Sequence, residues 1–221
     1  LGGGKAVLIG DPRKGKSERL WRAYGRVVDS LQGRYITAED VGTDAQDMGM
    51  IRRETRWVVG VPAEDGGSGD PSPKTAYGVF CAMKAVSRFL WETDDLSGRA
   101  VAVMGVGKVG GGLVDLLVEA GVRCVVADTY PPAVKAVQER HPEVKAVSTD
   151  EIFGVECDIF SPNSMGGALN EPSIARLRCR AVCGAANNQL ATEDDAKRLL
   201  SRGILYAPDF VVNAGGLINV T

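Results

Sequence analysis

Histidine and clustered cysteine are scarce in this sequence, and their scarcity argues against a structural metal site. The chain of 221 residues has one histidine, His141, and five cysteines that form no C-x-x-C pair, whereas a zinc site needs about four ligands close together. We therefore predict no bound metal. The scattered cysteines favour reduced thiols and a cytoplasmic location. No apolar run approaches the roughly 20 residues of a membrane-spanning helix.

An excess of one charge is also lacking, because 26 basic and 28 acidic residues leave a net charge of −2. Such a balance gives no electrostatic reason to expect binding to nucleic acid or to an anionic membrane. Glycine, in contrast, is plentiful at 28 residues, as expected where the backbone passes close to ligands. The first residue is not methionine, and the last residues still follow a regular pattern, so we expect the chain to be part of a longer protein.

From residue 99 onward, short apolar runs alternate with helical patterns. The expected strands are 100–104, 123–127, 157–160, 180–183 and 204–206, and the expected helices include 109–120 and 132–139. Alternation of this kind predicts an α/β fold built on a doubly wound parallel sheet of the Rossmann type.

The part before residue 99 has a less regular pattern. It predicts strands at 6–9, 34–38 and 57–59, helices at 17–32 and 44–53, and a long helix at 75–91. The stretch 64–73 is rich in Gly, Asp, Ser and Pro, which indicates a loop near a domain junction. We therefore expect part of a smaller α/β substrate domain over 1–73 and the Rossmann-type domain over 74–221.

The glycine turn after strand 100–104 has the pattern G-x-G-x-x-G of a dinucleotide site. Gly105 permits the tight turn, Gly107 lets the backbone approach a pyrophosphate, and Gly110 lets helix and strand pack closely. The helix that follows would direct its N–H groups at the phosphates. Cofactor contacts are therefore expected from the whole turn, which also includes Val106, Lys108 and Val109. The alternative is a glycine turn without a ligand.

Asp128 ends the next strand, about 20 residues after the first glycine, where an acidic residue binds the adenosine ribose hydroxyls. Its carboxylate would repel a 2′-phosphate, and no arginine stands in the turn that begins at Thr129. NAD is therefore favoured over NADP, with Thr129 as a neighbouring cofactor contact.

A second string, residues 10–17, matches the phosphate loop G-x-x-x-x-G-K-[ST]. Pro12 removes an N–H donor from such a loop, and Asp11 puts a negative charge beside the phosphates. A nucleotide hydrolase also needs an acidic partner for magnesium at the end of another strand; Asp128 could serve, but the dinucleotide site already uses it. We favour a solvated basic loop that caps a helix, and keep ATP or GTP hydrolysis as the alternative.

Lys5 follows three consecutive glycines, which allow a close approach to a ligand. Partial burial at a cleft would favour its neutral form and make it a general base; an exposed lysine after a flexible linker fits the pattern equally well. Asp40 closes the expected strand 34–38, where a carboxylate facing a cleft can carry a proton. An N-cap or a solvated loop acid is the more common use of aspartate there.

Several strings together resemble the family of glutamate, leucine, phenylalanine and valine dehydrogenases. The resemblance extends along essentially the whole chain and is greatest to the leucine and valine members. Its carriers are residues 2–5, 10–12, 34–43, 75–78, 105–110, 184–190, 206–209 and 213–216. The long strings 36–42 and 184–190 are far more specific than any glycine turn.

The resemblance implies NAD-dependent, reversible oxidative deamination of a branched-chain L-amino acid to its 2-oxo acid and ammonia, in a homo-oligomer. It gives Lys5 the activation of water and Asp40 a proton exchange with the amino group. The remaining residues it implies are Ala38 and Asn213 for the substrate, and Thr75, Asn163, Ala185, Ala186 and Asn187 for the cofactor. The alternatives are an aromatic amino acid dehydrogenase and a non-catalytic NAD-binding fragment.

Two departures from the family pattern bear on the site. The family carries a second lysine, upstream of the glycine run, that binds the substrate carboxylate, and that segment is not in this sequence. Where the family has Ala-Pro-Cys-Ala-Leu-Gly, this chain has Ser-Pro-Asn-Ser-Met-Gly at 161–166. Asn163 and Ser164 thus add polar groups near the expected cofactor, and we expect altered cofactor affinity or substrate preference.

Overall fold

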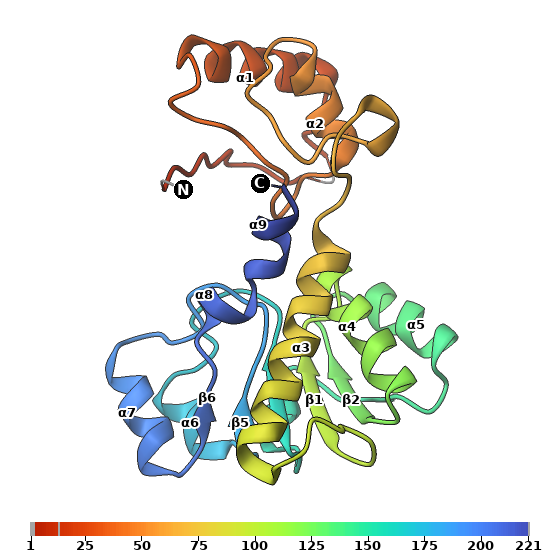
Figure 1. The fold of residues 1–221 in the computed structure, drawn as a ribbon, viewed down its shortest axis with the longest axis vertical. Helices are drawn as coiled ribbons and strands as arrows, with labels where there is room; N and C mark the ends of the chain where they lie inside the picture. Colours follow the sequence, from red (N-terminus) through yellow and green to blue (C-terminus); the bar gives the residue numbers. More distant parts are fainter. Residues whose placement is uncertain (1–2, 13, 221) are drawn as a thin grey trace. The chain divides into compact units, whose positions relative to one another are not determined.

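A computed structural model describes residues 3–12 and 14–220 and divides them into two compact units (Figure 1). The first unit extends to Pro71 and also includes Asn219, and the second runs from Ser72 to Ile218. The sequence-based boundary lay close by, after residue 73. Within the described residues, no helix is long and apolar enough to cross a membrane.

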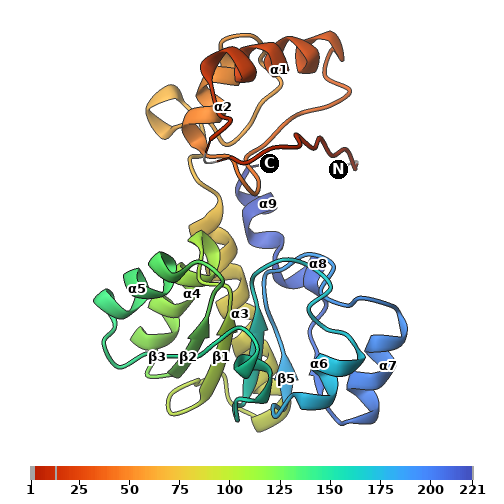
Figure 2. The same cartoon turned by 180° about the vertical axis from the view of Figure 1, so that it is seen from behind.

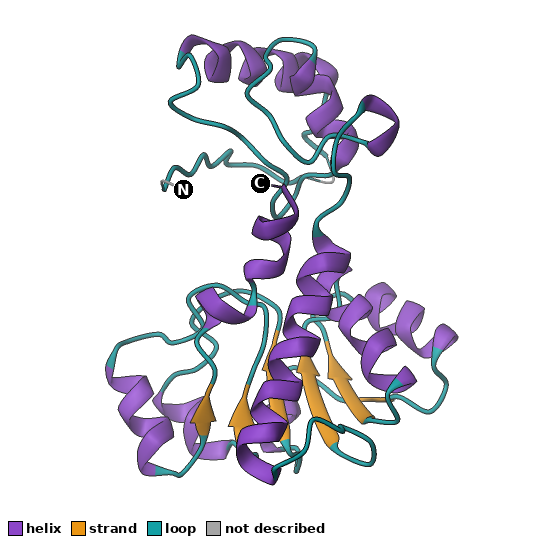
Figure 3. Cartoon of the chain, in the orientation of Figure 1, coloured by secondary structure: helices purple, strands orange, loops and turns teal. Residues whose placement is uncertain are grey.

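The second unit is built on one sheet of six parallel strands in the order β3-β2-β1-β4-β5-β6 (Figure 3). The strands are β1 Ala100–Met104, β2 Arg123–Ala127, β3 Lys145–Ala146, β4 Ile159–Pro162, β5 Ala181–Val182 and β6 Leu205–Tyr206. This sheet confirms the predicted doubly wound parallel fold, since the strand order reverses between β1 and β4.

Helices cover both faces of the sheet, because its central strands are apolar on both sides (Figures 1 and 2). The helices are α3 Ser72–Trp91, α4 Lys108–Glu119, α5 Pro131–Arg140, η2 Glu151–Gly154, α6 Glu171–Arg176, α7 Asp194–Ser201, α8 Asp209–Val212 and α9 Ala214–Val220. One core cluster joins α3, α4 and α5 to one face, through residues such as Met83 and Leu113. Another joins η2, α6 and α7 to the opposite face, around Phe160.

Asp158 joins three strands at the amino-terminal edge of this sheet. Its backbone N–H donates to the Ala100 carbonyl, its carboxylate accepts the Ala100 N–H at 2.8 Å, and its own carbonyl accepts the N–H groups of Arg180 and Ala181. The beginnings of β1, β4 and β5 are therefore fixed by one residue.

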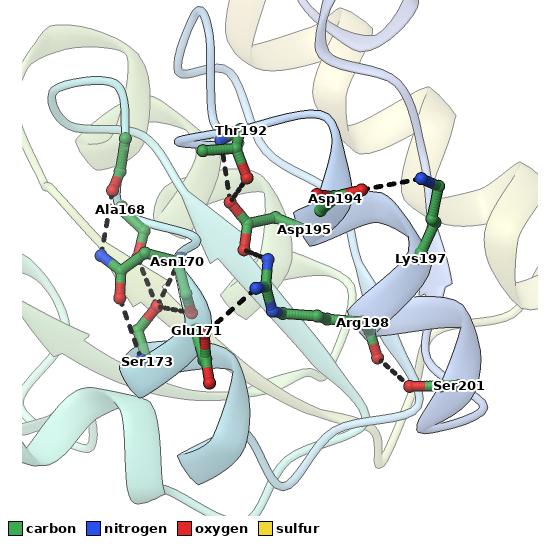
Figure 4. A network of polar contacts seen from close by, with 11 residues as sticks. Ala168, Asn170, Glu171, Ser173, Thr192, Asp194, Asp195, Lys197, Arg198 and Ser201 are labelled. Atoms are coloured by element: carbon green, nitrogen blue, oxygen red, sulfur yellow. Dashed lines mark hydrogen bonds and ion pairs between the residues drawn. The ribbon is translucent and has the colours of Figure 1, made fainter.

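A polar network fixes α7 against α6 (Figure 4). The Asp195 carboxylate, 1% exposed, accepts the Thr192 N–H at 2.8 Å, the Thr192 hydroxyl at 2.9 Å and an Arg198 N–H at 3.0 Å. Arg198 also pairs with Glu171 of α6 at 3.0 Å. Burial acts to raise the pKa of Asp195, but the bonds from Thr192 and the charge of Arg198 outweigh it and hold that pKa below its usual range.

The first unit contains α1 Glu18–Ser30, α2 Ala45–Arg52 and the short η1 Ala63–Asp65. The hydroxyl of Ser17 caps α1, and Asp44 and Asp47 form a capping box at the start of α2. Its small core is the cluster Trp21, Met48, Ile51, Val58 and Val61.

The strands predicted for the first unit are largely wrong. Residues 6–9 form no ladder, and Val7 and Ile9 are 78% and 101% exposed. The expected strands 34–38 and 57–59 meet only in a parallel bridge between Thr37 and Val58. Apolar runs become strands only when another strand takes up their backbone hydrogen bonds, and among the described residues of this unit no more of that pairing exists.

Candidate functional site

The glycine turn at the end of β1 uses its three glycines for three different purposes. Gly105 has φ of 90°, and a Cβ there would lie 2.8 Å from the Ser164 nitrogen. A Cβ at Gly110 would overlap the carbonyl oxygen of Gly105. A Cβ at Gly107 would meet nothing within 4 Å. Two of the glycines are therefore required by packing, and the third leaves open space beside the turn.

That open space lies at the amino end of α4. Gly107 is the N-cap of this helix, and within the described chain no side chain caps it. The first N–H groups of a helix need acceptors and carry a partial positive charge. The turn is therefore suited to a phosphate, because the phosphate oxygens would accept hydrogen bonds from these N–H groups and the space beside Gly107 is open.

Asp128 stands immediately after β2 and is half-buried. One carboxylate oxygen accepts the Val106 N–H and the other accepts the Tyr130 N–H, both at 2.8 Å. A carboxylate has about four acceptor positions, so these two bonds fix its orientation and leave capacity for hydroxyl donors. Thr129, next in the chain, is exposed beside it.

Asn163 follows β4 and links the ends of two strands. Its side-chain N–H₂ donates to the carbonyl and to the hydroxyl of Ser161, both at 2.9 Å, and its side-chain oxygen accepts the Ala185 N–H at 2.9 Å. Its backbone N–H donates to the Met104 carbonyl. The amide that the sequence placed toward the cofactor is thus hydrogen-bonded to protein, where it positions the loop after β5.

The same loop, residues 184–189, is fixed from two further sides. The Asn213 side chain donates to the Ala185 carbonyl at 3.2 Å and to the Asn187 side-chain oxygen at 2.6 Å. Beneath it, the fully buried Gln189 donates to the carbonyls of Gly184 and Ala186. Sequence reasoning missed this role of Gln189, although the residue belongs to the string 184–190.

Thr75 lies in the first turns of α3 and is half-buried. Near it the start of α9 approaches α3 very closely, because a Cβ on Gly78 would lie 3.3 Å from the Gly215 Cα. A Cβ on Gly215 would overlap the Lys74 carbonyl. Small residues on both helices therefore bring Thr75 and the residues that follow Asn213 into one region of the second unit.

The predicted cofactor residues share one location in the sheet. Those around Gly105 follow β1, Asp128 follows β2, Asn163 follows β4, and Ala185–Asn187 follow β5. All of these strands are parallel, so the residues gather at the carboxyl edge, on both sides of the point where the strand order reverses. Ligands of doubly wound sheets bind at this point.

Lys5 and Asp40 form an ion pair in the first unit, and their side chains are 66% and 47% exposed. Within this unit Lys5 is therefore largely exposed, whereas its role as a general base was predicted from partial burial. The Asp40 carboxylate also accepts the Val41 N–H at 2.7 Å, and the backbone of Asp40 is closed into a turn by the Thr43 hydroxyl. Ala38 is exposed two residues earlier.

Lys16, the lysine of the second phosphate string, is occupied by two carboxylates. Its ammonium group lies 2.5 Å from Asp47 and 3.1 Å from Asp44. Partial burial acts to lower the pKa of Lys16, but the bonds to these carboxylates raise it above the ordinary value. No strand precedes residues 10–17 in the described chain. This geometry favours the helix-capping loop over a nucleotide-hydrolysing one.

Two sequence models of one family match the chain. "Glu/Leu/Phe/Val dehydrogenase, dimerisation domain" matches residues 1–57, and "Glutamate/Leucine/Phenylalanine/Valine dehydrogenase" matches residues 127–220. The chain is 52% identical over 221 residues to a leucine dehydrogenase from Thermoactinomyces intermedius and, over the same length, 52% identical to a valine dehydrogenase from Streptomyces coelicolor. It spans 60% and 61% of these relatives, which cover 100% and 99% of it.

Solved structures agree with these matches. An L-tryptophan dehydrogenase from Nostoc punctiforme superimposes with a TM-score of 0.73 at 42% identity, over 93% of this chain and 58% of that one. A hetero-hexameric glutamate dehydrogenase from Thermus thermophilus gives 0.78 at 26% identity, over 95% of this chain and 56% of that one. The fold and the sequence therefore point to the same group of proteins.

Proposed function

We propose that this chain, which belongs to the glutamate, leucine, phenylalanine and valine dehydrogenase family, is the catalytic and cofactor-binding part of an NAD-dependent amino acid dehydrogenase. The reaction is the reversible oxidative deamination of a branched-chain L-amino acid to its 2-oxo acid and ammonia. The observation that carries the proposal is the pairing of an open, uncapped glycine turn with Asp128 at the same edge of the sheet.

The residues at this edge fit NAD. The open space at Gly107 would admit the pyrophosphate, and the remaining acceptor positions of Asp128 would suit the adenosine ribose hydroxyls. A 2′-phosphate would meet the Asp128 carboxylate with no arginine in the following turn, which disfavours NADP. When bound, NAD supplies the acceptor for the substrate hydride. Thr75 and Asn187 would hold the nicotinamide carboxamide, and Asn163 keeps the loop that carries Asn187 in place.

Lys5 and Asp40 would perform the proton chemistry. Their ion pair places an ammonium group beside a carboxylate that backbone contacts hold in one orientation. In the proposed roles, Lys5 activates water for attack on the imino carbon, and Asp40 exchanges a proton with the amino group. Asn213 and Ala38 would bind the substrate. Exclusion of water around these groups would strengthen their interactions during the reaction.

The branched-chain substrate is supported by the 52% identity to leucine and valine dehydrogenases. An aromatic substrate is the second candidate, because a phenylalanine dehydrogenase from Caldalkalibacillus thermarum is 48% identical over 225 residues. One methylene group in an apolar pocket changes transition-state binding by only about 1–3 kcal/mol, so kinetics have to decide between them.

We also propose that the whole protein is a cytoplasmic homo-oligomer acting on small molecules. The match of residues 1–57 to a family model described as a dimerisation domain supports self-association. The five cysteines, all free thiols, support a reducing compartment.

The test is NADH formation by the complete protein with leucine, valine, phenylalanine and glutamate. We expect turnover with leucine and valine to exceed turnover with the other two. Lys5→Ala should abolish turnover while NAD still binds, and the exposed Lys14→Ala is the matched control that should leave both unchanged. Bound NAD without turnover on any substrate would favour the non-catalytic alternative, and turnover by Lys5→Ala would refute the role of Lys5.

A further inference from the structure

Two of the five cysteines lie opposite each other at the amino-terminal edge of the sheet. A parallel bridge joins Glu156 to Arg178 in the same register as the pairing of β4 with β5. This register places Cys157 opposite Cys179, and the Cys157 N–H donates to the Arg178 carbonyl at 3.1 Å. Neighbouring strands lie about 4.8 Å apart, within the about 4.4–6.8 Å that separates the Cα atoms of a disulfide.

The two side chains also share an environment. Both are half-buried, and both pack against the core cluster that contains Phe160 and Leu177. The two thiols lie close enough that each shifts the pKa of the other. Both are free thiols in this structure. Backbone register and side-chain contact therefore agree that these two sulfur atoms can react with each other.

The two thiols are chemically unequal, because their interaction lowers the pKa of Cys179 and raises the pKa of Cys157. Burial opposes the effect at Cys179, but the Phe160 backbone and the positive charge of Arg202 favour its thiolate. Arg202 is held in place by the carbonyls of Ile174 and Leu177.

The other cysteines do not have this arrangement. Cys124 and Cys183 are buried, which raises the pKa of each thiol to about 12, so neither is suited to the first attack on peroxide, which needs a thiolate. Cys81 is exposed on α3. Cys124 and Cys183 can therefore serve as internal controls for a buried thiol, and Cys81 as the control for an exposed one.

We propose that Cys157 and Cys179 form a peroxide-sensitive dithiol, in which Cys179 is oxidised first and Cys157 completes a disulfide. The Cys179 thiolate attacks one oxygen of hydrogen peroxide, the O–O bond breaks, and Cys179 becomes a sulfenic acid. The other oxygen leaves as hydroxide and takes up the proton that the Cys179 thiol released, which gives one molecule of water. The Cys157 sulfur then attacks the Cys179 sulfur. An S–S bond forms, the S–O bond breaks, and the hydroxide leaves as a second water with the Cys157 proton.

The test is disulfide mapping of the complete protein after treatment with hydrogen peroxide and blocking of the remaining thiols with N-ethylmaleimide. Trypsin cleaves after Lys145, Arg176, Arg178 and Arg180, which separates Cys157, Cys179 and Cys183 into different peptides. We expect peptide 146–176 joined to the dipeptide 179–180, sensitive to reductant, while Cys124 and Cys183 remain unoxidised. Recovery of Cys157 and Cys179 as maleimide adducts, at a dose that oxidises Cys81, would overturn the proposal.

Two serine variants test the order of the steps. In Cys157→Ser the sulfenic acid at Cys179 has no partner, so dimedone should label Cys179. In Cys179→Ser, dimedone should not label Cys157, and Cys81→Ser should leave the disulfide yield unchanged. Labelling of Cys157 in Cys179→Ser, without labelling of Cys179 in Cys157→Ser, would overturn the assigned roles.

Discussion

The same substitution, glycine to alanine, should reduce stability at one position of the glycine turn and NAD affinity at another. At Gly110 the new methyl group would overlap the carbonyl oxygen of Gly105. Alanine gains about 1 kcal/mol over glycine in a helix, but forced overpacking costs about 1–3 kcal/mol and occasionally more. Because the obstacle here is backbone, the cost lies at the upper end, and we expect a net loss of about 2 kcal/mol.

At Gly107 the methyl group would meet nothing within 4 Å. The change also replaces a tolerated N-cap residue by a poor one, so the free energy of unfolding should fall by no more than about 1 kcal/mol. NAD binding should suffer instead, because the methyl group occupies the space through which the pyrophosphate approaches the backbone. A loss of at least about tenfold in affinity, or about 1.4 kcal/mol, is expected.

Urea unfolding and calorimetric titration with NAD separate the two effects. Gly110→Ala should lower the urea midpoint clearly, whereas Gly107→Ala should lower it by half as much or less and should lose affinity for NAD. Undiminished NAD binding by Gly107→Ala would show that the phosphates do not lie at this turn. Undiminished stability of Gly110→Ala would refute the packing argument.

Three further changes test the residues around this turn and the α6–α7 network. Asn163→Ala removes three hydrogen bonds of about 0.5–1.5 kcal/mol each, so urea unfolding should show a loss of about 1–3 kcal/mol, and the exposed Ser164→Ala should show none. Asp128→Asn should narrow the preference for NAD over NADP about tenfold in titrations with both cofactors, because a charge repulsion of about 1–4 kcal/mol is removed; an unchanged ratio would argue against the ribose contact. The pKa of Asp195 is lower folded than unfolded, so its contribution to stability is complete above its unfolded pKa of about 3.9 and disappears as the pH falls through the folded pKa. Asp195→Asn should therefore be less stable than the parent at neutral pH and should lose less stability on acidification below about pH 4; parallel curves would contradict this.

The second unit could be predicted from sequence because its signals are local. The strand at 100–104, the helix after it and the strand at 123–127 each have their own apolar pattern, and the glycines between them fix the turn. The two-residue strand β3 was missed, since Lys145 and Ala146 are both exposed and have no apolar pattern. The roles proposed for the site residues remain predictions.

The structure of residues 6–9 and the orientation of Asn163 could not be predicted, because both depend on contacts with residues distant in the sequence. Residues 6–9 are apolar enough for a strand, but a strand also needs a neighbour, and none of the described residues provides one. At Asn163 the residue type indicated a polar group near the cofactor. The orientation of the Asn163 side chain depends on its hydrogen bonds with Ser161 and Ala185. These two residues come from two strands that meet only in the folded sheet.

The strand order also has a consequence for how the second unit folds. Ala100 stands opposite Arg123 of β2 in the register, but its own N–H and carbonyl are both bonded to Asp158, which is 58 positions away. Closing this connection costs about 0.8 kcal/mol more chain entropy than closing the one between Ala100 and Arg123. The contacts that offset this cost form only when β4 is in place. In pulsed hydrogen exchange, β1, α4 and β2 are therefore expected to gain protection before β4 joins β1, so the edge where the two halves of the sheet meet is completed late.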